Sequence, residues 1–354
     1  MQLPNKTRDQ VSDIGAARRL ILEFGWNAMS YQLVNPGMRL WFADSAPGVI
    51  GYVEAGGYRI VAGAPVTSES EMLGVVQGFA RSSRAAGKRV AFFGAQDRLE
   101  TVLAEESPVS RMLLGAQPLW HPEHWLANER RKKSLRAQLA RARNHHVRVE
   151  IAEAADEAVH RCLREWLAAR GLPALHFLVE PQTLDRLYDR RLYVARQRSE
   201  TWGFLLASPI PLRNGWLIEQ IVRRPRAPNG TAELLLDRAM HDFHALGNSC
   251  VTLGLSPLST RVTQPDQPFW LRCVLSWMRA HGSRFYNFRG LENFKAKFLP
   301  DVWEPIHVLA LEPQIRPALL WAIIRAFAGT SPVWFLSKAL GRAAAQELSG
   351  FARR

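Results

Sequence analysis

Cysteine is scarce in this 354-residue chain, which contains only Cys162, Cys250 and Cys273. These residues form no CxxC pair and no cluster with histidine, so the sequence predicts neither a disulfide framework nor a metal site, and it suits a reducing cytoplasm. The polar N-terminus lacks the apolar core of a signal peptide. No uninterrupted apolar run reaches the roughly 18 residues that a membrane span needs. We therefore expect a soluble or peripheral protein.

The sequence motifs of several catalytic classes are also missing. The chain contains no GxSxG, SxxK or HExxH motif and no Walker A loop. This argues against serine hydrolases, zinc proteases and P-loop enzymes. The absence suits an enzyme whose substrate is already activated, and we predict that it needs no cofactor.

Acidic residues are outnumbered, with 32 Asp and Glu against 46 Lys and Arg, a net charge of +14 and a pI near 10.4. This excess predicts nucleic acid or an anionic membrane surface as a partner. Residues 129–148 hold eight basic side chains in 20 positions. We interpret them as a basic connecting helix that contacts phosphates, with a solvated helix as the alternative. The residues predicted to make these contacts are Arg130, Arg131, Lys132, Lys133, Arg136, Arg141 and Arg143.

Two segments about 160 residues apart share one pattern. Helical spacing over 68–87 ends in a glycine and runs into a short strand, 88–94, and the same order recurs over 231–247 and 248–254. A strand and a proline-containing turn precede each helix. The repeat predicts a duplicated α/β unit.

The predicted fold class is therefore α/β with mixed sheets, built as two acyltransferase-like domains side by side. Further strands are expected at 39–44, 48–55, 191–197 and 201–207, and a helix at 155–170. The predicted limits are a first domain over 1–128, the basic helix over 129–148, a second, catalytic domain over 149–312 and amphipathic helices over 313–354. We interpret this last segment as helices that lie at the membrane surface, with a helix packed on the core as the alternative.

The turn RRPRAPNGTAE, residues 223–233, stands directly before the second helix of the repeat. Backbone N–H groups at that helix start, together with Arg223, Arg224, Asn229 and Gly230, predict an anion or substrate site. The spacing is one residue longer than the pyrophosphate motif of GNAT enzymes, which disfavours coenzyme A as donor. Glu219 lies in the apolar strand before this turn. We predict it as general base, with an ion pair to a nearby arginine as the alternative.

The stretch RFYNFRGLENFKAKFLPDVWEP, residues 284–305, interleaves aromatic and cationic side chains. Lys295 and Lys297 are predicted catalytic residues that stabilise an oxyanion or hold phosphate, with solvent-facing lysines as the alternative. The further residues predicted to bind substrate are Ser256, Tyr286, Phe288 and Glu304.

These motifs resemble the C-terminal domain of phosphatidylglycerol lysyltransferases, the multiple peptide resistance factors. The segments that carry the resemblance are AGAPVTS (62–68), SLRAQLARA (134–142), EQIVRRPRAPNGTAELLL (219–236), LGLSPLS (253–259) and FYNFRGLENFKAKFLPDVWEP (285–305). The resemblance implies two tandem GNAT-like domains and transfer of an amino acid from aminoacyl-tRNA to a lipid such as phosphatidylglycerol, at the cytoplasmic face of the membrane.

The resemblance places the family's acidic strand residue on Glu219, its lysine pair on Lys295 and Lys297, and its W-E-P on residues 303–305. The family's arginine three residues after the acid is replaced by Val222, and Arg223 is the neighbouring substitute. The flippase domain that usually precedes this one is not expected. Two other readings stay open: an acyltransferase with an acyl-thioester donor, and a non-catalytic RNA- or membrane-binding protein. The sequence does not indicate the oligomeric state.

Overall fold

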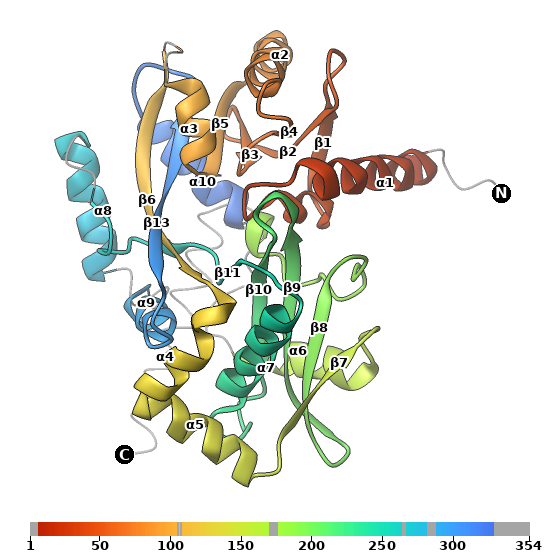
Figure 1. The fold of residues 1–354 in the computed structure, drawn as a ribbon. Coiled ribbons are helices and arrows are strands. Elements are labelled where there is room, and N and C mark those ends of the chain that lie inside the picture. The colour runs from red at the N-terminus through yellow and green to blue at the C-terminus, as the bar shows by residue number, and fades with distance from the viewer. Residues whose placement is uncertain are drawn as a thin grey trace.

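One mixed β-sheet runs through both halves of the chain in the computed structural model (Figure 1). The structure describes residues 6–104, 106, 108–169, 176–263, 267–281 and 288–328. The strands are β1 (Arg39–Phe42), β2 (Gly48–Ala55), β3 (Tyr58–Ala62), β4 (Val66–Thr67), β5 (Arg89–Ala95), β6 (Ser110–Trp120), β7 (Arg148–Ala152), β8 (Arg191–Gln197), β9 (Glu200–Ile210), β10 (Gly215–Arg223), β11 (Cys250–Thr252), β12 (Ser256–Pro257) and β13 (Val302–Ala310).

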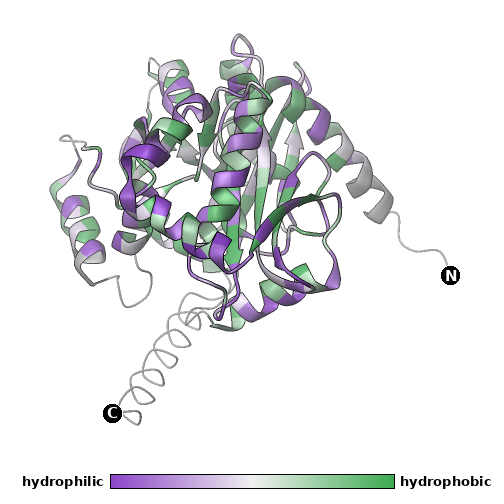
Figure 2. Ribbon diagram, turned by 60° about the horizontal axis from the view of Figure 1, so that its bottom comes forward, coloured by the Kyte–Doolittle hydropathy of each residue, from purple (hydrophilic) through white to green (hydrophobic). Residues whose placement is uncertain are grey.

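Helices cover the sheet on its outer faces. They are α1 (Lys6–Phe24), α2 (Met72–Ala85), α3 (Asp97–Leu103), α4 (Trp125–Arg131), α5 (Lys133–Asn144), α6 (Glu157–Ala169), α7 (Thr231–Ala245), α8 (Phe269–His281), α9 (Phe288–Ala296) and α10 (Pro317–Ala328), with 3-10 turns η1 (Ser30–Val34), η2 (Pro122–His124), η3 (Phe177–Val179) and η4 (Pro211–Arg213). Figure 2 shows hydrophobic residues along the central strands and alternating hydropathy along the surrounding helices. This is the pattern of helices that bury one face on a sheet.

The repeated unit and the mixed α/β class predicted from the sequence are confirmed. β3, α2 and β5 form one unit, and β10, α7 and β11 form the other, each with its two strands parallel. Gly87 and Gly247 have positive φ values of 67° and 71°, a conformation that glycine adopts at low cost. The amide that follows each glycine bonds back to the last turn of its helix, at Ser83 and Phe243. Both helices therefore end in the same glycine-dependent cap.

The two halves exchange strands at the centre of the sheet. β13, near the end of the described chain, lies between β5 and β6, and β6 in turn pairs with β11 of the second half. The predicted domain limits, 1–128 and 149–312, stay a prediction. They assign β13 to the second domain, although β13 pairs with β5 and β6 of the first. The exchange makes the sheet continuous from β1 to β7.

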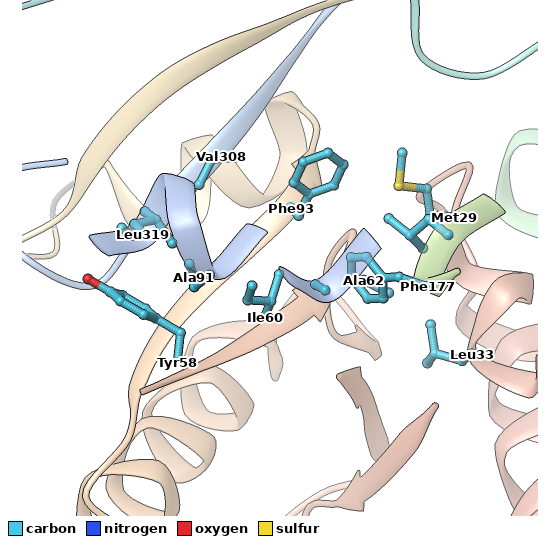
Figure 3. Close-up of a cluster of buried hydrophobic side chains, with 14 of the residues drawn as sticks. Met29, Leu33, Tyr58, Ile60, Ala62, Ala91, Phe93, Phe177, Val308 and Leu319 are labelled. Atoms are coloured by element: carbon cyan, nitrogen blue, oxygen red, sulfur yellow. The ribbon is translucent and has the colours of Figure 1, made fainter. Parts of the chain in front are cut away.

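The largest apolar cluster of the first half also takes in later parts of the chain (Figure 3). Phe93 of β5, Phe177 of η3 and Phe327 of α10 form a triangle of edge-to-face contacts with ring centroids 5.0–6.2 Å apart. Such pairs stabilise a core beyond their area burial. Segments from three distant parts of the sequence thus form one core.

The basic segment forms two helices, α4 and α5, with an extended residue at Lys132 between them. The predicted apolar pair Leu135 and Leu139 is buried, and α5 packs on α7. At the other end of the chain, α10 buries Leu319 in the core, while Trp321 is exposed. Residues 329–354 of the predicted tail lie outside the described residues. Among the helices that the structure describes, none has the length and apolarity to cross a membrane.

Candidate active site

The parallel pairing of β10 with β11 is short, because β11 has only three residues. The two strands pair from Gly215 with Cys250 to Leu217 with Thr252. The pairing of β10 with β9 is shifted by a bulge between Ile218 and Gln220, which leaves Glu219 outside the regular register. Bulges redirect side chains and often lie next to active sites. Glu219 lies at this bulge, and Lys295 bonds the carbonyl oxygens of Gly254 and Leu255 just after β11.

Glu219 forms a buried ion pair. The Arg190 Nε lies 2.8 Å from Glu219 Oε1, and Arg190 Nη2 lies 3.3 Å from Oε2. The Glu219 side chain is 3% exposed, and that of Arg190 is 0% exposed. This is the ion-pair alternative considered for Glu219, and it places the carboxylate away from solvent. Its role as a general base stays a prediction.

Arg190 carried no signal in the sequence, because it stands beside Arg191 in an ordinary charged turn in front of a strand. In the structure its Nη2 also donates to Asn35 Oδ1 at 2.5 Å, its Nη1 donates to the Arg186 carbonyl, and its guanidinium lies 4.9 Å from the centre of the Tyr31 ring. Asn35 and Tyr31 belong to the first half of the chain. Arg190, the partner of Glu219, is thus held in place by residues of the other half of the chain.

Val222, which replaces the family's arginine, is fully buried in an apolar cluster with Phe204 and Leu206. Arg223 is exposed at the end of β10. The guanidinium next to Glu219 is therefore that of Arg190, and Arg223 does not occupy this place.

Lys295 is buried at the end of α9, with 4% of its surface exposed. Its ammonium donates to the carbonyl oxygens of Gly254 at 2.8 Å and Leu255 at 2.9 Å. Burial lowers the pKa of Lys295 to about 7. The side chain therefore holds the segment between β11 and β12 and does not face solvent, which was the alternative considered for this lysine. Its catalytic role stays a prediction.

Lys297 lies beyond the end of α9 and contacts the first turn of α7. Its Nζ lies 2.5 Å from Glu233 Oε1, and it stands 4.2 Å from the centre of the Phe294 ring and 4.9 Å from that of Phe298. Its side chain is 32% exposed. Of the two predicted lysines, Lys297 is the one that reaches solvent.

The predicted anion site at the start of α7 is covered by another helix. Gly230 is buried, and a Cβ built on it would lie 1.9 Å from the backbone oxygen of Gln138 in α5. Asn229 is exposed. Arg224 is bound to Glu165 and Glu200, with Nε 2.6 Å from Glu165 Oε2, so its charge is used within the fold. These residues stay predictions as substrate ligands.

Glu304 joins the two halves of the chain. It accepts two hydrogen bonds from Arg213, at 2.6 and 3.0 Å, and one each from Gln96 and Gln117. Four donors on one carboxylate favour a structural connection between the two halves. Its predicted role in substrate binding stays a prediction.

The other predicted substrate residues are spread over α9 and β12. Ser256 is buried, and its hydroxyl has no hydrogen-bond partner among the described residues. Phe288 is half-buried at the start of α9. Tyr286 lies outside the described residues.

The basic residues of α4 and α5 form an exposed surface. Arg130, Arg131, Lys133, Arg136, Arg141 and Arg143 are exposed, and Lys132 is half-buried. Arg143 Nη2 bonds Asp237 of α7 at 2.9 Å. The ligand atoms of Glu129, Asp237 and His241 lie within 4.8 Å of one another, as a metal site would require. Asp237 is already bonded to Arg143 and to the Trp125 indole, so these groups satisfy it without a cation.

A pocket of about 340 Å³ opens between α4 and α9. In Figure 1 these two helices lie side by side near the lower end of β13. The pocket is lined by Asn128, Arg131, Arg261, Ala296, Leu299, Pro300, Asp301 and Trp303. Arg261 was not selected from the sequence, because it stands alone in a loop. Ala296, which lies between the two predicted lysines in the sequence, is part of this lining.

Solved structures share this fold. The DUF2156 C-terminal domain of a proposed lysylphosphatidylglycerol synthetase from Agrobacterium fabrum superposes with a TM-score of 0.76 at 22% identity, covering 90% of this chain and 98% of that one. L-PGS from Bacillus licheniformis gives 0.74 at 19% identity, covering 88% and 95%. FemX gives 0.53 at 10% identity, covering 92% and 99%. These likenesses show that the chain shares its fold with these proteins.

The family described as phosphatidylglycerol lysyltransferase, C-terminal, matches residues 18–310. This chain belongs to that family, and it is an aminoacyltransferase. A comparison with curated proteins found no match. Family membership supports a transferase that aminoacylates a lipid.

Proposed function

We propose that this protein transfers an aminoacyl group from aminoacyl-tRNA to a hydroxyl group of a membrane lipid such as phosphatidylglycerol. The observation that carries the proposal is the family match over residues 18–310, which includes the repeated unit and all three predicted catalytic residues. The net charge of +14 suits both partners, since each is a polyanion. It also suits a peripheral position at the cytoplasmic face of the membrane.

The packing of α5 favours a tRNA donor over an acyl-thioester. A thioester donor such as coenzyme A carries a pyrophosphate, which binds well at the open N-terminus of a helix. Here Gln138 of α5 lies against Gly230 at the start of α7 and covers that position. The outer face of the same helix carries exposed arginines, which suit an RNA backbone.

The chemistry requires positioning more than activation. The aminoacyl ester on tRNA is already reactive, so the lipid hydroxyl attacks its carbonyl carbon, a base accepts the hydroxyl proton, and the 3′ oxygen of the tRNA leaves with a proton. Lys297 reaches solvent and can stabilise the negative oxygen of the tetrahedral intermediate when its ion pair with Glu233 opens. Glu219 is enclosed by Arg190, so its role as base requires that this ion pair opens when the acceptor binds.

A donor assay tests the proposal. Purified protein is mixed with phosphatidylglycerol vesicles and with tRNA charged with each labelled amino acid in turn, and label in the lipid phase is measured. We expect label from one amino acid, and we expect Lys297→Met to lower the rate about 10²–10³-fold while tRNA binding persists. Transfer from an acyl-thioester but from no charged tRNA would refute the proposed donor. Binding of tRNA without any transfer would favour the non-catalytic reading.

A further inference from the structure

The pocket between α4 and α9 is lined by cationic, aromatic and acidic side chains, a combination that is not required to bind a small anion alone. Arg131 and Arg261 supply positive charge, Trp303 supplies an aromatic wall, and the Asp301 carboxylate lies in the same pocket. A bare phosphate would meet a negative charge there. A nucleotide has both a phosphate for the arginines and a flat base for the ring and the carboxylate.

The pocket's polar groups are held in place by the surrounding fold. Arg261 Nε bonds Glu292 of α9 at 3.1 Å, and its guanidinium lies 5.6 Å from the centre of the Trp303 ring. Asp301 Oδ2 accepts the backbone N–H of His121 at 2.8 Å, and Asp301 Oδ1 lies 3.0 Å from His124 Nδ1. Groups that are fixed in this way lose little freedom when a ligand binds.

The position of the pocket connects two parts of the proposed function. Arg131, which lines the pocket, belongs to the basic surface of α4 and α5, and Ala296, which also lines it, lies between Lys295 and Lys297 in the sequence. An RNA backbone on the basic surface would therefore extend past Arg131 into the pocket.

We infer that this pocket binds a nucleotide of the single-stranded 3′ end of the tRNA, an inference that rests on the proposed tRNA donor. Aromatic rings and arginine planes bind single-stranded bases by stacking, and arginines pair with the phosphates. The 3′ end of tRNA has the sequence CCA. Both cytosine and adenine carry an exocyclic amino group, from which a carboxylate such as that of Asp301 can accept a hydrogen bond. A phosphatidylglycerol headgroup offers neither a base to stack nor such a donor.

Binding of two RNA hairpins tests the inference. One hairpin carries a single-stranded 3′ ACCA tail and the other is the same hairpin with a blunt end, and both dissociation constants are measured by fluorescence anisotropy. We expect the wild-type protein to prefer the tailed hairpin about tenfold or more, because stacking of one base contributes about 1–3 kcal/mol. We expect Arg131→Gln and Arg261→Gln to reduce that preference several-fold.

A matched control is Arg136→Gln, on the exposed basic surface of α5 but outside the pocket. It should weaken both hairpins equally and leave their ratio unchanged. Arg131 is exposed, so Arg131→Gln tests the pocket even if Arg261→Gln disturbs folding.

Three results would overturn the inference. The first is an equal affinity of the wild-type protein for both hairpins, and the second is an unchanged preference in the two pocket variants. The third is an unchanged hairpin preference combined with weaker binding of the pocket variants to phosphatidylglycerol vesicles in a flotation assay. That combination would assign the pocket to a lipid phosphodiester. These results leave the proposed donor intact, whereas a wild-type protein that binds neither hairpin would refute the donor itself.

Discussion

The two repeated units have the same order of elements but differ in how their strands pair. β3 and β5 pair over five residues, from Tyr58 with Arg89 to Ala62 with Phe93. β10 and β11 pair over three residues, and a bulge next to Glu219 shifts the pairing of β10 with β9. The two units thus share an order of elements but not the length and regularity of their strand pairing.

The surroundings of the two units can be compared through their buried charges. The first unit packs on the apolar cluster of Figure 3, and the buried Glu312 accepts a hydrogen bond from Tyr58 of this unit. Near the second unit the structure buries Arg190, Glu219 and Lys295. Buried charges are tolerated when they are paired, and here Arg190 pairs with Glu219 while Lys295 bonds two backbone carbonyl oxygens.

The largest effect is expected from breaking the ion pair of the second unit. Arg190→Met leaves Glu219 buried without its partner, and we expect a loss of about 3–5 kcal/mol in the free energy of unfolding, measured in urea. Arg224→Met is the matched control, since the pairs of Arg224 with Glu165 and Glu200 are partly exposed, and it should cost about 1 kcal/mol or less. Equal losses in the two variants would show that the Glu219 pair is no more demanding than a surface pair.

The second effect compares one glycine from each unit. Gly87→Ala adds a Cβ with no atom within 4 Å, so it costs only the left-handed backbone, about 1–2 kcal/mol. Gly230 has φ of +93°, and its Cβ would also meet Gln138 of α5. We expect Gly230→Ala to cost about 1–3 kcal/mol more than Gly87→Ala, because α5 must move. Similar melting temperatures for the two variants would mean that α5 does not hold the start of α7.

The smallest effect concerns the pH dependence of stability. Burial lowers the pKa of Lys295 to about 7, below the value of about 10.4 in an unfolded chain. Between these values the unfolded chain binds a proton that the folded chain lacks, so the Lys295 contribution to stability rises with pH. We expect the stability of the wild-type protein relative to Lys295→Met to rise by about 1–2 kcal/mol from pH 7 to pH 9. Parallel pH profiles of unfolding would contradict a depressed pKa.

Several features of the fold could be predicted from local patterns. The repeated unit was visible because each helix ends in a glycine with a left-handed backbone, Gly87 and Gly247, and because strand and helix periods are local properties of the chain. Family membership was visible in the segments around Glu219 and Lys295. The apolar positions Leu135 and Leu139 of the basic segment also faced the core as their spacing predicted.

The arrangement around the site could not be predicted in the same way. Arg190 stands in an unremarkable context, and its pairing with Glu219 depends on how β8 and β10 are brought together. Arg261 and Trp303 share a pocket although some 40 residues separate them in the sequence. Such pairs arise from the packing of distant elements, which no local pattern records.

The sequence alone determined the elements of this protein, their duplication and its family, because helix and strand periods, glycine caps and motif spacing are properties of neighbouring residues. Only the tertiary structure decided that β13 inserts between β5 and β6, that α5 covers the start of α7 and that Arg190 closes over Glu219. These outcomes depend on contacts between residues far apart in the chain, whose free energy is realised only when the whole sheet assembles.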